Sequence, residues 1–203
     1  RKNFDVKGTI RHNQRFMGVP IEIKHRKRHL KPKITVIVDV STSMRPVAEF
    51  MLRMVYELQD QISKARSFAF ISDLNDISIV FEENRPAEAV EKVLTTLPPG
   101  HYNTDLGNSM ATFSKDFAEA VDRRTTLIFV GDARNNYNDP RTDLMQHLKL
   151  RAKRVVWFNP EPPAMWGSGD SDMLQYAPIS NAVHQVATLK QLADAVDDLF
   201  VLR

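Results

Sequence analysis

The feature that most constrains this chain is a continuous run of apolar and β-branched residues that ends at an acid. Residues 34–38 (Ile-Thr-Val-Ile-Val) do not alternate between polar and apolar, which predicts a strand buried on both faces. Asp39 follows directly, and Ser41 and Ser43 come at alternate positions after it. Apolar residues then recur at helical spacing over residues 47–62. Because open α/β sheets bind ligands at the carboxyl ends of their strands, we expect a ligand site in the loop after residue 38.

The rest of the chain repeats the order of a strand followed by a helix. Further strands are expected at residues 67–72, 77–81, 125–130, 154–158 and 182–186. The short gap before residues 77–81 predicts a hairpin, which would make this strand antiparallel and place it at an edge. The sequence therefore predicts an α/β fold, a doubly wound and mostly parallel sheet with one antiparallel edge strand and helices on both faces.

The basic residues gather at the start of the sequence. Residues 1–33 hold 11 Lys and Arg but 2 Asp and Glu, whereas the remaining residues hold 17 basic and 23 acidic ones. We therefore divide the chain into a basic N-terminal arm with an edge strand, residues 1–33, and a main domain, residues 34–203. The arm is expected to pack on the acidic domain, and an RNA-binding or other anion-binding surface is the alternative. Residues 24–29 contain no aromatic side chain to stack on bases, which argues against nucleic acid.

Composition excludes several other classes of protein. The chain has no cysteine, so neither a disulfide framework nor a thiolate metal site is expected. No apolar run approaches the ~20 residues that a membrane-spanning helix needs. No signal-peptide pattern opens the sequence, and we expect a cytoplasmic protein.

Three separate segments carry oxygen-bearing side chains where the predicted strands or loops end. The candidate metal ligands are Asp39, Ser41, Ser43, Thr104 and Asp132. Since parallel strands end at the same edge of a sheet, these side chains are expected to converge there. Carboxylates and hydroxyls completed by water suit Mg²⁺, whereas zinc would favour Cys or paired His ligands. Asp105 is expected to cap the following helix or to accept a hydrogen bond from a metal-bound water.

These motifs resemble the metal-ion-dependent adhesion site (MIDAS) of von Willebrand factor type A (VWA) domains. Asp39-Val-Ser-Thr-Ser43, then Thr104 and then Asp132 follow the order of the motifs in that family. The resemblance implies direct binding of the ion by the first motif, and direct or water-mediated binding by the two later residues. Thr42 departs from the family pattern, which usually has Gly at this position. A positive φ there would strain a β-branched residue.

Flanking segments narrow the resemblance to the CoxE-like branch, which is found beside MoxR-type AAA+ ATPases. The segments are residues 8–11, the basic run before the first strand, residues 156–160 and residues 169–173. The resemblance implies a protein-interaction module rather than an enzyme, which binds a Glu or Asp of a partner through Mg²⁺, with Mn²⁺ or Ca²⁺ as alternatives. The implied partners are the ATPase, a client such as a metalloenzyme that it matures or activates, or both. The residues that would contact the partner are not assigned.

A Mg²⁺-dependent phosphohydrolase is the catalytic alternative. Such enzymes can use an Asp at a strand end as the nucleophile, with a second carboxylate two residues later as the acid. Here Ser41 occupies that second position. The sequence also lacks the glycine-rich phosphate loop with Lys and the dinucleotide-binding glycine motif. No residue is therefore predicted to be catalytic.

Overall fold

The computed structural model describes residues 33–61, 64–97 and 104–201. The predicted N-terminal arm therefore lies outside the described residues, except for Lys33, which begins the first strand. None of the helices in the described ranges combines the length and apolarity that a membrane crossing requires.

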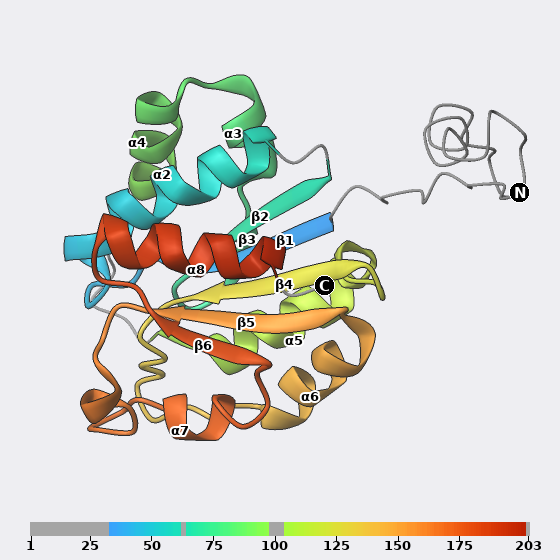
Figure 1. Cartoon of the computed structure of the whole chain (residues 1–203), viewed down its shortest axis with the longest axis vertical. Helices are drawn as coiled ribbons and strands as arrows, with labels where there is room; N and C mark the ends of the chain where they lie inside the picture. The colour runs from blue at the N-terminus through green and yellow to red at the C-terminus, as the bar shows by residue number, and fades with distance from the viewer. Residues whose placement is uncertain (1–32, 62–63, 98–103, 202–203) are drawn as a thin grey trace, which may run out of the picture. The chain divides into compact units, whose positions relative to one another are not determined.

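The described residues form a six-stranded sheet. Figure 1 shows the arrangement of its strands. The strands are β1 (Lys33–Asp39), β2 (Ala65–Phe70), β3 (Leu74–Asp76), β4 (Thr125–Val130), β5 (Arg154–Asn159) and β6 (Ala182–Gln185), in the spatial order β3-β2-β1-β4-β5-β6. Every neighbouring pair is parallel except β2 and β3, which run antiparallel at one edge. This arrangement confirms the predicted fold class.

The register of the central strands positions the candidate site. Asp39 pairs with Phe70 at the end of β2, while Val38 pairs with Val130 at the end of β4. Residues 39 and 131–132 therefore leave two adjacent strands at the same edge of the sheet. Ile34, Val36 and Val38 point into one core and Ile37 into the other, so β1 is buried on both faces as predicted.

Helices cover both faces of the sheet (Figure 1). The helices are α2 (Arg45–Gln61), α3 (Ser78–Glu83), α4 (Pro86–Thr96), α5 (Leu106–Asp116), α6 (Thr142–Arg151), α7 (Met173–Tyr176) and α8 (Leu189–Val201), with short 3₁₀ turns η2 (Ala118–Ala120) and η3 (Pro163–Met165). Residues of α2, α3, α4 and α8 belong to one apolar core, and residues of α5, α6 and α7 to the other.

The strand predicted at residues 77–81 is wrong. The antiparallel edge strand lies earlier, at Leu74–Asp76, and residues 78–83 form α3. Asp76 Oδ1 accepts a hydrogen bond from the Ser78 backbone N–H at 2.9 Å, which stabilises the first turn of the helix. Ile77 and Phe81, four residues apart, are both buried, whereas Ile79 between them is exposed. The apolar residues of this segment are therefore spaced for a helix. The segment is too short for its sequence to distinguish helical spacing from the alternation of a strand.

Candidate metal centre

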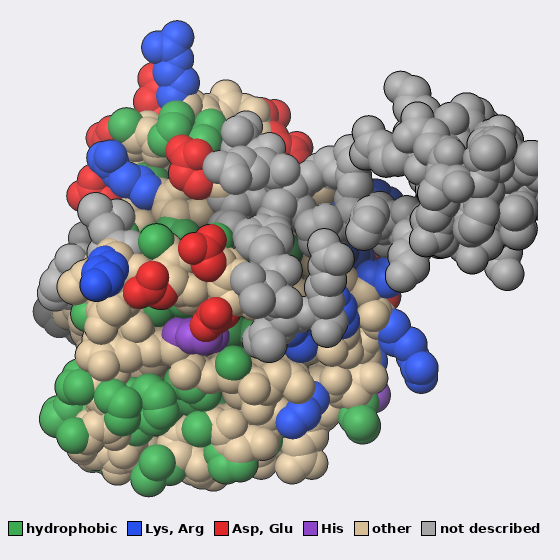
Figure 2. All heavy atoms as spheres, in the orientation of Figure 1, with side chains coloured by type: hydrophobic (Ala, Val, Ile, Leu, Met, Phe, Trp, Pro, Cys, Tyr) green, Lys and Arg blue, Asp and Glu red, His purple; other side chains and the backbone are tan. Residues whose placement is uncertain are grey.

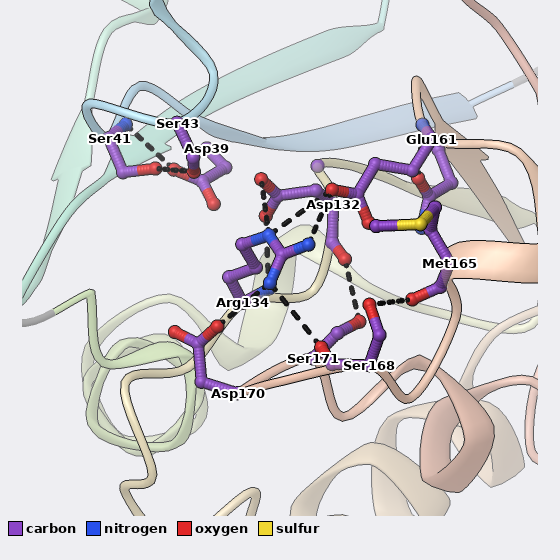
Figure 3. Close-up of polar contacts among 12 residues, drawn as sticks. Asp39, Ser41, Ser43, Asp132, Arg134, Glu161, Met165, Ser168, Asp170 and Ser171 are labelled. Carbon is purple, nitrogen blue, oxygen red and sulfur yellow. Dashed lines mark hydrogen bonds and ion pairs between the residues drawn. The ribbon is translucent and has the colours of Figure 1, made fainter.

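The first part of the candidate site is the loop between β1 and α2. Asp39 ends β1 and is buried, with 1% of its surface exposed. Its Oδ1 accepts a hydrogen bond from the Ser41 backbone N–H at 2.7 Å, so the chain turns back over the carboxylate. The hydroxyl oxygens of Ser41 and Ser43 lie 3.1 Å apart, and Figure 3 shows both beside Asp39. The loop thus gathers one carboxylate and two hydroxyls, as the sequence predicted.

The second part comes from the adjacent strand β4, through Gly131 and Asp132. A Cβ atom on Gly131 would lie 2.9 Å from the Asp39 Cβ, so a residue without a side chain is needed where these two segments meet. Asp132 is buried at 2% exposure, and its Oδ1 accepts a hydrogen bond from the Arg134 backbone N–H at 2.9 Å. The side chain of Ser43 acts to lower the pKa of Asp132, and the charge of Asp132 acts to raise the pKa of Asp39. The structure therefore brings Asp132 to the first loop.

The two carboxylates are held in an environment that disfavours their negative charge. Burial raises the pKa of Asp39 to about 8, with a further contribution from the charge of Asp132, against the hydrogen bonds from Ser41. Burial also raises the pKa of Asp132, although hydrogen bonds from Arg134 and Ser43 act in the opposite direction. A divalent cation between the two carboxylates would reverse this cost, because it favours their ionised forms.

The donor set fits a hard cation. Among the described residues, no three Asp, Glu or His side chains are grouped so as to hold a metal ion by themselves. Two carboxylates supplemented by the hydroxyls of Ser41 and Ser43 are a set of oxygen donors of the kind that Mg²⁺ accepts together with water. The side chains that the structure places at this edge of the sheet are therefore of the types predicted as metal ligands.

Thr104 lies near this edge through its backbone. Its carbonyl oxygen accepts a hydrogen bond from Asn138 Nδ2 at 3.0 Å, in the segment that follows Asp132. The next backbone N–H, of Asp105, donates to Ile71 O at 2.8 Å, just beyond the end of β2. In the part of the chain that the structure describes, the Thr104 hydroxyl makes no hydrogen bond to the other four candidates, so its role as a ligand stays a prediction. Asp105 was expected to cap the following helix or to accept a hydrogen bond from a metal-bound water. In the structure it is the N-cap of α5, and its side chain accepts a hydrogen bond from the Asn108 backbone N–H at 2.7 Å.

Thr42 does not carry the strain that its departure from the family pattern suggested. Within the described ranges, the non-glycine residues with positive φ are Ala133, Asn136, Tyr137 and Arg141. Thr42 is exposed and adopts an ordinary backbone conformation. The loop therefore forms without a glycine at its middle position.

Arg134, which lies beside Asp132, was not predicted from the sequence. Arg134 Nε lies 3.8 Å from Asp132 Oδ2 and 3.2 Å from Glu161 Oε1. Its Nη2 lies 2.7 Å from the same Glu161 oxygen, and its Nη1 lies 2.9 Å from Asp170 Oδ1 (Figure 3). The hydrogen bonds with Glu161 contribute most to raising the pKa of Arg134. The only signal in the sequence is a set of acids in the long connection after β5, and their partner could not be identified without the fold.

The sheet order, with β1 at its centre and one antiparallel edge, and the loop at the carboxyl end of β1 define a von Willebrand factor type A domain. The family model described as "VWA domain containing CoxE-like protein" matches residues 1–195. The chain therefore belongs to the CoxE-like family of VWA proteins. The comparison with curated proteins gives no match.

Solved structures share the fold at low sequence identity. Proximal thread matrix protein 1 from the mussel byssus, described with a zinc-occupied MIDAS motif, gives a TM-score of 0.57 at 14% identity, over 84% of this chain and 47% of that one. Protein BatB from Bacteroides thetaiotaomicron gives 0.55 at 14% identity, over 83% of this chain and 97% of that one. A von Willebrand factor type A protein from Catenulispora acidiphila gives 0.56 at 13% identity, over 87% and 43%. This chain thus spans less than half of the mussel and Catenulispora chains.

Proposed function

We propose that this chain is a metal-dependent protein-interaction module. Asp39, Ser41 and Ser43 would bind a divalent cation directly, and Thr104 and Asp132 would bind it directly or through water. The observation that carries this proposal is the pair of buried carboxylates, from adjacent strands, with two hydroxyls beside them. Two ionised, buried carboxylates cost free energy in the absence of a cation, and a cation bound between them would offset this cost.

The ligand set supports capture of an outside acid. Hydroxyl ligands are neutral, so two carboxylates and two or three hydroxyls leave the ion electrophilic. An oxygen of a partner's Glu or Asp would complete the coordination in place of water. We propose Mg²⁺ as the ion, with Mn²⁺ or Ca²⁺ as alternatives. The zinc-occupied MIDAS motif described for the mussel protein supports a cation at this edge of the fold.

The family supports a specific kind of partner. We propose that the chain acts in the cytoplasm with a MoxR-type AAA+ ATPase, as a chaperone-like assembly factor that helps to mature or activate a metalloenzyme or other client. Membership of the CoxE-like family is the finding that supports this partnership. We assign no catalytic residue, since Ser41 occupies the position at which a phosphohydrolase of the kind considered above needs an acid.

Binding to the MoxR-type ATPase of the same organism tests this proposal. We expect Mg²⁺ to support binding, and both EDTA and Asp39→Ala to weaken it by about tenfold or more, because a metal-bridged carboxylate would be lost. Asp116→Ala is the matched control, since Asp116 is an exposed acid at the end of α5. Equal affinity in Mg²⁺ and in EDTA would contradict the proposal, provided that thermal unfolding shows each variant to be folded.

A further inference from the structure

Glu161 is a third carboxylate, separated from Asp132 by the side chain of Arg134. It lies two residues after β5, and its backbone N–H donates to Asn159 Oδ1 at 2.8 Å. Trp166 Nε1 donates to the Glu161 carbonyl oxygen at 3.1 Å, so the backbone of Glu161 is held at both its N–H and its C=O. Its Oε2 atom is buried and accepts no hydrogen bond from the described residues. One oxygen of this carboxylate therefore has unused acceptor capacity.

A single guanidinium lies between Glu161 and Asp132. Arg134 Nε contacts Glu161 Oε1 at 3.2 Å and Asp132 Oδ2 at 3.8 Å, so the two carboxylates face each other across one nitrogen atom. The charge of Glu161 also acts on Asp132, whose pKa it helps to raise. Figure 3 shows the guanidinium among Asp132, Glu161 and Asp170.

Contacts on its other side hold the guanidinium in this position. Arg134 Nη1 donates to Asp170 Oδ1 at 2.9 Å and to the Ser168 carbonyl oxygen at 3.4 Å. Asp170 is itself fixed, because its Oδ2 accepts a hydrogen bond from the Asn136 N–H at 3.1 Å. Arg134 therefore has hydrogen-bond partners besides Glu161, whereas both side-chain hydrogen bonds of Glu161 among the described residues come from Arg134.

We infer that Arg134 prevents Glu161 from becoming a ligand of the bound ion and so keeps one coordination position open for the carboxylate of a partner. This inference rests on the proposed function. Arg134 is a positioning residue in this account, because it acts on the ion only through Glu161.

The physical reason is competition between two cations for one carboxylate. A half-buried carboxylate that loses its ion pair carries a desolvation cost, and it recovers that cost by binding another cation. Without Arg134, a divalent ion bound beside Asp132 would be available as that cation. Glu161 would then supply a third carboxylate, which would tighten metal binding and remove the water that an outside acid must displace.

Mn²⁺ binding to the whole chain tests this inference, with Arg134→Ala, Glu161→Gln and the double variant. Calorimetry gives the affinity, and water-proton relaxation reports the exchangeable waters on the ion. We expect Arg134→Ala to bind Mn²⁺ about tenfold more tightly and to hold one water fewer. Both effects should vanish in the Glu161→Gln background. Acetate, as a probe for an outside carboxylate, should displace water from Mn²⁺ on the wild type but not on Arg134→Ala.

Two controls make the outcome decisive. Arg141→Ala removes an arginine that pairs with Asp143 and should leave Mn²⁺ binding unchanged. Arg134→Gln replaces the alanine variant if the latter does not fold. A tighter affinity that persists in the double variant would reflect charge removal alone and would overturn the inference, as would no change in Arg134→Ala.

The same measurements separate this inference from the proposed function. Loss of Mn²⁺ binding in Asp39→Ala, with no effect of Arg134→Ala, would overturn the inference and leave the proposed metal site standing. Equal Mn²⁺ binding by the wild type and Asp39→Ala would overturn both.

Discussion

Asp39 is a buried acid whose hydrogen bonds do not offset the cost of its charge. Its pKa is raised to about 8, mainly by burial, although the Ser41 backbone N–H donates to it. In the unfolded chain the same group would titrate near 3.8. Between these two pKa values, the metal-free folded protein therefore keeps Asp39 protonated, whereas the unfolded chain has released this proton.

This difference predicts how stability depends on pH. The stabilisation from the Asp39 proton is complete below about pH 4 and is lost as the pH rises through the folded pKa near 8. The melting temperature of the metal-free wild type should therefore fall between pH 5 and pH 8. Asp39→Asn should flatten this dependence and, at pH 8, exceed the wild type in unfolding free energy by on the order of 2 kcal/mol.

Differential scanning calorimetry in EDTA and in excess Mg²⁺ checks this prediction. Mg²⁺ should stabilise the wild type at pH 8 and have no such effect on Asp39→Asn. Asp116→Asn, an exposed acid, should follow the wild type throughout. Parallel stability curves for Asp39→Asn and the wild type would show that Asp39 does not titrate as described.

The proximity of Asp39, Ser41, Ser43 and Asp132 could be predicted from the sequence because local spacing and strand order carry the information. Asp39, Ser41 and Ser43 lie in one loop after an unmistakable buried strand, and Asp132 follows a second such strand. Arg134 and Glu161 could not be predicted, because their pairing depends on how two separate connections fold over the same sheet edge.

At the scale of elements, the contact between the ends of β1 and β4 determines the geometry of the site. Gly131→Ala would place a methyl group 2.9 Å from the Asp39 Cβ. We expect a loss of about 1–3 kcal/mol in unfolding free energy from this overpacking, together with weaker Mg²⁺ binding, because Asp39 must move. Denaturant unfolding and calorimetric Mg²⁺ titration measure the two effects.

Tyr176→Phe is the matched comparison for Gly131→Ala. Tyr176 stacks on Trp157 and donates its hydroxyl to the Pro140 carbonyl oxygen at 2.7 Å, so the variant should lose about 1 kcal/mol. It should keep the Mg²⁺ affinity of the wild type, since it does not touch Asp39 or Asp132. Equal effects of the two variants on Mg²⁺ binding would mean that general loosening, rather than the contact at Gly131, explains the result.

Element prediction succeeded where hydrophobic patterns were long and failed where they were short. The central strands β1, β4 and β5 and the helix α2 lie where the sequence predicted them. The second strand of the edge hairpin was predicted at residues 77–81 but lies at Leu74–Asp76. Residues 77–81 are too few for their sequence to distinguish a helix from a strand. The Ser78 backbone N–H donates to Asp76 Oδ1, and the Ser67 backbone N–H donates to the Ser78 hydroxyl. These contacts with the neighbouring strands favour the helix and cannot be read from apolar spacing.

At the scale of the whole molecule, the doubly wound sheet brings residues that are distant in the sequence close together in space. Asp39 and Asp132 are far apart in the chain, yet β1 and β4 are neighbours and end together. An apolar core packs on each face of this sheet, and the polar loops lie at its edge. The family model extends across residues 1–195 and so includes the basic segment before β1, which lies outside the described residues.

The most direct test of the central claim is a crystal structure of the protein grown with Mn²⁺, with anomalous scattering recorded at the manganese edge. The account predicts a strong anomalous peak bonded to oxygens of Asp39, Ser41 and Ser43, with Asp132 coordinating the ion or one of its waters. A map without a peak at this edge, from crystals grown in saturating Mn²⁺, would contradict it.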